Sequence, residues 1–186
     1  MGVGDLNHWK IFETNIVNHS LAMGLDVLKI PEGVRLVYDK SRKLIPVRFK
    51  TCFDFVVSFS GVSAYFDAKC MSSGSRLNYK NHVSGADKIH QWAALQTAWD
   101  KGVVAGYLIW FPKDSLIGWA NVPTIRNSIA KGDLSLDKST EGVLWQEDLT
   151  VINLRALMKT DLESWQKKFV TATTASQQKL SAPLTT

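Results

Sequence analysis

The sequence DFVVSFSGVSAYFDAKC, residues 54–70, combines the composition of a buried β-hairpin with three charged side chains. Aromatic and β-branched residues fill two runs that flank Ser60-Gly61, and Ser-Gly is a dipeptide that favours tight turns. A two-residue turn at that point places Asp54 directly opposite Asp67 on the partner strand. The stretch therefore predicts a hairpin in which two acids face each other.

Side chains alternate between the two faces of a strand, so the charges gather on one face of this hairpin. Asp54 and Asp67 become cross-strand neighbours with Cβ atoms roughly 5 Å apart, and Lys69 follows two residues later on the same face. The opposite face carries an apolar layer of Phe55, Val57, Phe59, Val62, Ala64, Phe66 and Ala68. Like charges at opposed positions destabilise a sheet, so the two acids need an explanation.

Two interpretations of this charged face are open from the residues alone. In the first, Lys69 neutralises one of the acids and the whole face lies in solvent. In the second, Asp54 and Asp67 converge on a Mg²⁺ ion, which prefers hard oxygen ligands, and the carbonyl of Ala68 adds a third ligand. Lys69 would then orient or activate a water molecule, or stabilise the charge that develops on a phosphate. Only the second interpretation explains why the repulsion is tolerated.

The pattern D-x12-D-x-K resembles the signature of the PD-(D/E)xK nucleases. Phe53-Asp54 corresponds to the first half of that signature, and Asp67-Ala68-Lys69 corresponds to the second half. The usual Pro is absent and the second acid is Asp, both of which are tolerated variants. The resemblance implies a restriction-endonuclease-like α/β fold, with a central mixed sheet flanked by helices.

The surroundings of this pattern resemble the RecU-type Holliday junction resolvases over about residues 8–112. Four features carry the resemblance: Phe12-Glu13 in a first helix, the basic run KLIPVRFK at 43–50, the hairpin itself, and His90-Gln91 followed by G-x-x-x-x-Y-L-I-W-F. The resemblance implies a homodimeric, Mg²⁺-dependent DNA endonuclease of recombination and repair, with Mn²⁺ as a substitute. Such an enzyme nicks two strands of a four-way junction and leaves 5′ phosphates.

The resemblance also implies roles for individual residues. The implied catalytic residues are Lys69, Asp54, Asp67, Glu13 and Gln91, and the implied metal ligands are Asp54, Asp67, Ala68 and Glu13. Two departures concern substrate contacts: Thr51-Cys52-Phe53 replaces the family's run of Ser or Thr, and the segment that resembles the family's DNA-inserting stalk is short. No resemblance extends beyond Phe111.

The chain is basic overall, with a formal net charge of +5. A basic surface suits a polyanionic partner such as DNA. The basic side chains on both sides of the predicted hairpin are Arg42, Lys43, Arg48, Lys50, Arg76, Lys80 and Lys88. These charges form either a solvated surface or a DNA-binding surface, and their position around a predicted phosphodiester site favours contacts with backbone phosphates.

The rest of the chain predicts a single nuclease domain over residues 1–170 and a flexible tail over 171–186. Predicted helices cover 5–23, 87–102 with a capping box at Ser84 and Asp87, 124–132, and a segment that starts with a capping box at Thr160 and Glu163. Further predicted strands cover 34–38, 103–111, 116–122 and 149–154, and residues 39–50 are expected to form an exposed excursion.

No signal peptide and no apolar run of membrane-spanning length is visible, so we expect a soluble cytoplasmic protein, as in a bacterium or a phage. Cys52 and Cys70 lack metal-ligand spacing, and reduced thiols are favoured over a disulfide across the hairpin. Core packing is favoured over base stacking for four tryptophans on apolar patterns, Trp92, Trp99, Trp110 and Trp119.

Three functions remain open: a junction resolvase, which is favoured, a duplex or restriction-like nuclease of the same fold, and a catalytically silent DNA-binding module. Resolution of a junction needs two symmetric nicks, and a homodimer with two active sites supplies them most simply. The apolar stripe of the helix at 87–101 and the apolar residues after Phe111 are candidate dimer interfaces.

Overall fold

The computed structural model describes residues 3–31, 33–38, 43–49, 51–59, 62–86, 88–147, 151–164 and 167, with the backbone alone described at 3–6, 33–38, 44–49 and 59. The expected flexible tail, the Ser60-Gly61 turn, Arg42, Lys50 and Asp87 lie outside the described residues. The single domain over 1–170 therefore stays a prediction.

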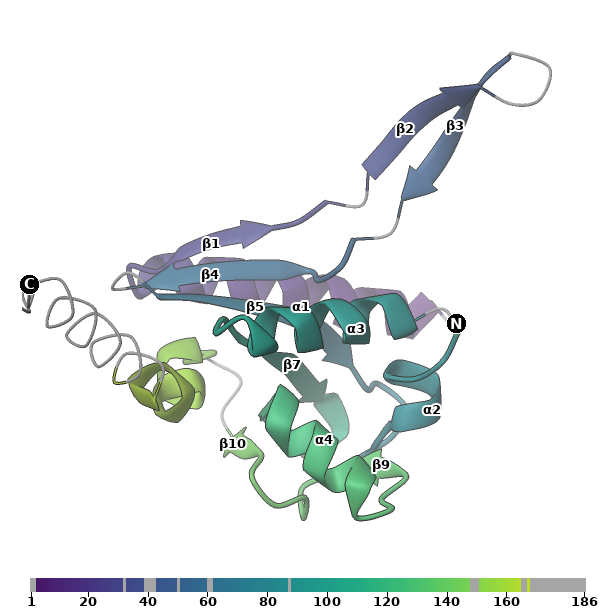
Figure 1. Ribbon diagram of the computed structural model, residues 1–186. Helices are drawn as coiled ribbons and strands as arrows, with labels where there is room; N and C mark the ends of the chain where they lie inside the picture. Colours follow the sequence, from purple (N-terminus) through teal and green to yellow (C-terminus); the bar gives the residue numbers. More distant parts are fainter. Residues whose placement is uncertain are drawn as a thin grey trace, which may run out of the picture.

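A six-stranded sheet forms the centre of the molecule (Figure 1). In spatial order its strands are β1 (Asp26–Lys29), β4 (Phe55–Phe59), β5 (Val62–Cys70), β7 (Val104–Phe111), β8 (Leu116–Asn121) and β10 (Leu144–Gln146). Strands β5 and β7 pair in parallel, and all other neighbours in this sheet pair antiparallel. The predicted mixed sheet is therefore confirmed.

Helices cover both faces of this sheet. Helix α1 (Val3–Ala22) and the helix at 154–164 bury their apolar side chains against one face. On the other face lie α2 (Tyr79–His82), α3 (Ile89–Asp100) and α4 (Val122–Ala130). Strand β7 is buried at all eight positions, as its uniformly apolar sequence predicts for a central strand between two helical layers. The predicted α/β class is confirmed.

The register of the β4–β5 hairpin is the one its sequence predicts. Phe55 pairs with Phe66 and Val56 pairs with Tyr65, and the apolar layer that includes Ala64 packs in the core beneath α1. The charged face is not exposed, however, because α3 covers it. Asp67 and Lys69 are both buried, so the interpretation that placed this face in solvent is wrong.

A second hairpin projects from the body of the molecule (Figure 1). Its strands are β2 (Gly33–Tyr38) and β3 (Leu44–Phe49), and they pair antiparallel along their whole length. Residues 44–49 thus form a strand where the sequence predicted only an exposed excursion. Three short elements complete the described fold: β6 (Leu77–Asn78), η1 (Pro112–Asp114) and β9 (Ser135–Leu136).

Two helix starts differ from prediction. Helix α3 begins after Lys88, which makes no side-chain capping bond, and the Ser84 hydroxyl donates instead to the Tyr79 carbonyl. The C-terminal helix begins at 154 rather than at Thr160. The Asn153 side chain caps it by accepting a hydrogen bond from the Ala156 N–H at 3.0 Å.

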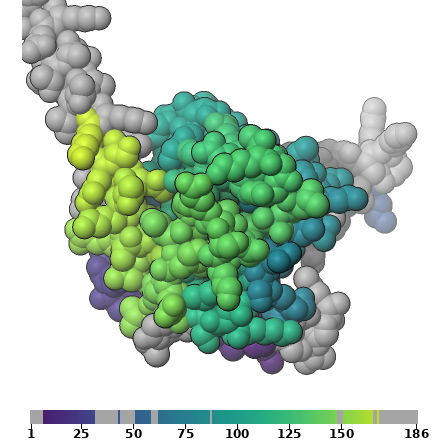
Figure 2. Space-filling model, turned by 90° about the horizontal axis from the view of Figure 1, so that it is seen from below, coloured from purple at the N-terminus to yellow at the C-terminus, as the bar shows by residue number. Residues whose placement is uncertain are grey.

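The segment before that helix is not the predicted strand, because residues 151–153 pair with no strand and β10 precedes them. Ile152 is buried in the core, and its N–H donates to His19 Nδ1 of α1 at 2.9 Å. This bond ties the C-terminal segment to α1. Figure 2 shows α4 and the segments that follow it as one continuous face of the molecule.

The apolar stripe of α3 is divided between the core and the surface. Trp92 and Leu95, together with Ala98, are buried against the sheet and cannot contribute to a dimer interface, whereas Ile89 is 54% exposed, so an interface at that end of the helix stays a prediction. Trp110 and Trp119 are buried as predicted, and Cys52 and Cys70 do not form a disulfide with each other. Within the described residues, no helix combines the length and the apolar character that a membrane crossing requires.

Candidate active site

The site forms where β5 extends beyond the end of β4. Strand β4 begins at Phe55, which pairs with Phe66 of β5. Beyond Phe66, β5 continues to Cys70, and β7 is its partner there among the described strands. Asp54 lies at this step, with its N–H bonded to the Phe66 carbonyl at 3.1 Å and its carbonyl bonded to the Ile30 N–H at 2.7 Å. Both bonds fix the backbone of Asp54 and leave its carboxylate beside the unpaired end of β5.

The Asp54 carboxylate accepts a backbone hydrogen bond from β5 that a neighbouring strand would otherwise accept. Asp54 Oδ2 accepts the backbone N–H of Ala68 at 3.0 Å. Alternate residues of a strand direct their N–H and C=O groups to the same side, so Ala68 shares the orientation of Phe66 toward β4. The Ala68 carbonyl therefore faces the same side of β5 as the Asp54 carboxylate.

Three buried polar side chains form a closed network next to Asp54. Asp67 is 0% exposed, Lys69 is 6% exposed, and Gln91 of α3 is 7% exposed. Lys69 forms an ion pair with Asp67 Oδ2. Gln91 Nε2 donates to Asp67 Oδ1 at 2.9 Å, and Lys69 Nζ lies 3.5 Å from Gln91 Oε1. An amide suits this position because it donates to the acid and accepts from the lysine at once.

The carboxyl group of Asp54 is held toward its protonated form. Burial, followed by the hydrogen bond and the charge of Asp67, raises the pKa of Asp54 from its ordinary 3.8 to about 8. Lys69 and the Ala68 N–H act in the opposite direction but do not cancel the rise. Two converging carboxylates of this kind attract a cation.

Tyr107 lies behind Lys69, and sequence reasoning missed it. It is the partner of Asp67 in the parallel β5–β7 register, and its ring centroid lies 5.6 Å from Lys69 Nζ. The hydroxyl is buried and finds no hydrogen-bond partner among the residues that the structure describes. Burial, and then the charges of Asp67 and Asp54, raise the pKa of this phenol. The ring stacks on Trp92, which follows Gln91 in α3.

His82 at the end of α2 is a second residue that the sequence did not assign to the site. Burial lowers its pKa, and the positive charges of Lys69 and Lys88 lower it further. The imidazole is therefore held toward its neutral form beside the lysines. No ligand spacing in the sequence indicated this position, because the charge of Lys69 acts on His82 only in the folded chain.

A cavity of about 670 Å³ opens over this network. Asp54, Lys69 and Gln91 line it, and so do Glu13 of α1 and Lys88 before α3. The structure thus brings five of the predicted site residues to one cavity.

Glu13 does not join the two aspartates. It pairs instead with Lys29 of β1 at 2.5 Å. No three side chains of His, Cys, Asp or Glu in the described ranges form a group that could hold a metal ion. The donor atoms present nevertheless fit a hard divalent cation, because the carboxyl groups of Asp54 and Asp67 and one backbone carbonyl lie together at this place.

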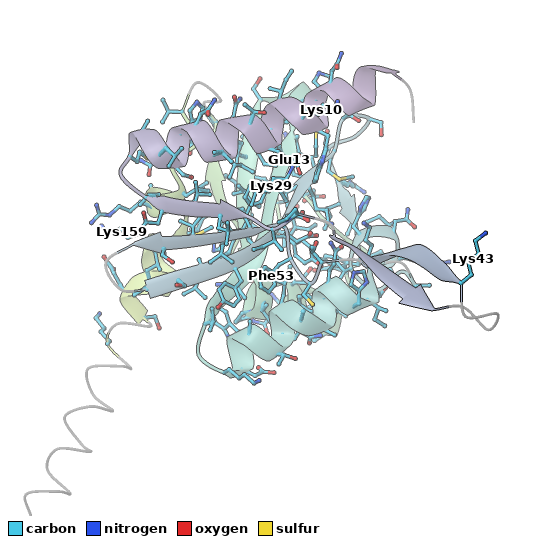
Figure 3. The ribbon with its side chains drawn as sticks, turned by 90° about the horizontal axis from the view of Figure 1, so that it is seen from above. Lys10, Glu13, Lys29, Lys43, Phe53 and Lys159 are labelled. Atoms are coloured by element: carbon cyan, nitrogen blue, oxygen red, sulfur yellow. The ribbon has the colours of Figure 1, made fainter. Side chains whose placement is uncertain are left out.

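The predicted DNA-binding residues scatter over several places. Lys88 reaches the cavity, and Lys80 is exposed on α2. Lys43 lies at the far end of the projecting hairpin (Figure 3). Arg48 lies in β3, where the structure describes only its backbone. Arg76 pairs with Asp137 at 3.3 Å.

The chain resembles known proteins among the solved structures. No protein-family model matches the chain, and no curated protein matches it. Among solved structures, the chain is similar to Hjc of Archaeoglobus fulgidus, a Holliday junction resolvase from an archaeal hyperthermophile, with 15% sequence identity and a TM-score of 0.45. The match covers 70% of this chain and 89% of that one. Because a likeness at this level does not establish a family, function is inferred from the site.

Proposed function

We propose that the protein is a metal-dependent DNA endonuclease that resolves four-way junctions by paired nicks. The observation that carries the proposal is that Asp54 and Asp67 lie together beside the buried Lys69. They do so where β5 extends beyond β4, next to an open cavity. Two acids and a lysine in that arrangement suit phosphodiester hydrolysis, because they provide a cation site and a positive charge next to it.

Asp54, Asp67 and the Ala68 carbonyl would hold a divalent cation, Mg²⁺ or its substitute Mn²⁺. When bound, that ion neutralises phosphate charge and lowers the pKa of water. Lys69 stabilises the negative charge of the phosphate in the transition state or orients the attacking water. Attack by the water oxygen on phosphorus forms one P–O bond and breaks the bond to the 3′ oxygen, which takes up a proton. The products are a 3′ hydroxyl and a 5′ phosphate. Gln91 positions Asp67 and Lys69 relative to each other through its two hydrogen bonds.

Junction DNA is the proposed substrate, and two features support it beyond the resemblance to resolvases. A hairpin projects from the body next to the site (Figure 1), and an open cavity gives a bulky substrate access to Asp54. A homodimer would supply the second nick. Sedimentation equilibrium at micromolar protein should then give about twice the chain mass of 20.8 kDa.

Cleavage assays separate the candidate functions. A labelled four-way junction and a matched linear duplex are incubated with the protein, with Mg²⁺ or with EDTA. The resolvase proposal predicts Mg²⁺-dependent paired nicks in the junction and little cutting of the duplex. Equal cutting of both substrates would favour the duplex nuclease, and tight binding without any cutting would favour the silent binding module.

A further inference from the structure

The wall of the cavity also carries an ion pair, and its acidic member is Glu13, the third acid predicted for the site. Glu13 Oε2 of α1 lies 2.5 Å from Lys29 Nζ, the last residue of β1. Figure 3 shows the two side chains between α1 and the edge of the sheet. Glu13 is 15% exposed and Lys29 is 46% exposed, so the pair sits at the boundary between the cavity and solvent.

Backbone pairing holds Lys29 close to Asp54. Lys29 is the partner of Phe55 in the β1–β4 register, and the next residue, Ile30, donates its N–H to the Asp54 carbonyl. Lys29 and Asp54 also line the same cavity. A positive charge at this place has two available kinds of partner: the carboxylate of Glu13, and a phosphate of any strand that enters the cavity.

Lys29 can pair with Glu13 or with a phosphate, but not with both at once. While Lys29 holds Glu13, the Glu13 carboxylate is neutralised, and within the described chain Glu13 does not form a three-acid group with Asp54 and Asp67 that could hold a metal ion. An ion pair with a half-exposed lysine is weak and screened by solvent, so an incoming phosphate can displace it. The other lysine at the acids cannot make this exchange in the same way, because Lys69 is buried against Asp67.

We propose that Lys29 couples DNA binding to cation binding by changing partners. In the free protein it holds Glu13, and when DNA enters the cavity it turns to a backbone phosphate and leaves Glu13 as a further ligand for the cation. Lys29 is thus a positioning residue that acts through Glu13. The inference rests on the proposed function, since it assumes that DNA and a cation share this cavity.

Cation binding without DNA gives the first test. Isothermal titration calorimetry with MnCl₂ compares the wild-type chain with Lys29→Met, which frees Glu13. Lys10→Met is the matched control, because Lys10 lines a neighbouring groove with Glu13 and Lys29 but does not pair with Glu13. We expect Lys29→Met to bind Mn²⁺ about fivefold more tightly than wild type or more, and Lys10→Met to change the affinity little. Adding Glu13→Gln to Lys29→Met should remove the gain.

DNA binding in EDTA gives a second, metal-free test by a double-mutant cycle. Glu13→Gln frees Lys29 for phosphate, so DNA affinity should rise and the slope of log affinity against log salt should steepen by about one phosphate contact. In the Lys29→Met background, Glu13→Gln should have no such effect. Circular dichroism melts of each variant check that the fold is intact, which the partial exposure of Lys29 favours.

The outcomes separate this inference from the proposed function. Equal Mn²⁺ affinity in wild type and Lys29→Met, or an equal gain in Lys10→Met, would overturn the partner exchange and leave the nuclease proposal standing. An additive DNA cycle would also overturn it. If no form of the chain binds Mn²⁺ or DNA, both the inference and the proposed function fail.

Discussion

Asp54 and Asp67 face each other at the open end of the β4–β5 hairpin, but different partners hold them. Asp54 accepts a backbone N–H from β5, whereas Asp67 is held by the side chains of Lys69 and Gln91. Burial, and then the hydrogen bond and the charge of Asp67, raise the pKa of Asp54 to about 8, and Lys69 does not cancel this rise. The metal-free site is therefore strained electrostatically, and this has measurable consequences for stability.

The first prediction concerns stability against pH. The pKa of Asp54 is higher in the folded state, about 8, than its ordinary 3.8, so the folded chain binds more protons between these values. The contribution of Asp54 to stability is then present at low pH and is lost as pH rises from about 4 to about 8. In EDTA, urea denaturation should show a steeper loss over this window for wild type than for Asp54→Asn.

Mg²⁺ supplies the control for that experiment. A cation that binds the ionised acids should restore wild-type stability at the upper end of the window and leave Asp54→Asn largely unaffected. Parallel stability curves for the two proteins in EDTA would show that Asp54 carries no such strain.

The second prediction concerns the buried ion pair of Lys69 and Asp67. Lys69→Met leaves the Asp67 charge buried without its partner, which should cost about 3–5 kcal/mol in the free energy of unfolding. Asp67→Asn combined with Lys69→Met removes both charges and should recover most of that loss. Denaturant melts of both single variants and the double variant measure the coupling. Additive losses would mean that the two side chains do not act as a pair.

The third prediction concerns Gln91. Gln91→Leu keeps the volume but removes the amide that joins Asp67 to Lys69, and we expect cleavage to slow about 10- to 100-fold. DNA affinity in EDTA should stay near the wild-type value, because Gln91 positions the acids and does not hold phosphates. Gln96, which accepts from Arg126 on the outer side of α3, offers a matched control. Gln96→Leu should leave the cleavage rate unchanged, and an equal effect of both changes would remove the assigned role.

The fourth prediction concerns Tyr107, whose ring contacts Lys69 while its buried hydroxyl has no partner. Tyr107→Phe keeps the ring and removes an unsatisfied polar group, so stability should change by less than about 1 kcal/mol or rise. Tyr107→Leu removes the ring and should destabilise the chain by about 1–3 kcal/mol and slow cleavage as well. A large loss of stability in Tyr107→Phe would show that the hydroxyl has a partner in solution.

The hairpin was predictable because local rules decide it. A turn dipeptide and a side-chain period of two fix which residue opposes Asp54, and the observed register agrees. The parallel partner of β5 is set by a contact between distant segments, so Tyr107 could not be placed beside Asp67 from local pattern. Lys29 was missed for the same reason, because β1 approaches the acids only after it pairs with β4.

The starts of two helices were predicted wrongly for a different reason. Capping boxes are short and recur by chance, and Thr160 with Glu163 offered such a match inside a helix that Asn153 in fact starts. The residues 149–154 contain enough β-branched side chains to indicate a strand, yet burial of Ile152 and its bond to His19 hold the described part of this segment in an irregular form. Tertiary packing overrode local propensity at this point.

Single-turnover cleavage of an end-labelled four-way junction tests the central claim most directly. Wild type and Asp54→Asn are compared in Mg²⁺ and in EDTA, at protein concentrations that saturate binding of both. We expect wild type to nick opposed strands and leave 5′ phosphates only in Mg²⁺, and Asp54→Asn to bind the junction but cut it at least about 100-fold more slowly. Cutting by Asp54→Asn at the wild-type rate, or wild-type cutting that persists in EDTA, would contradict the assignment of this site.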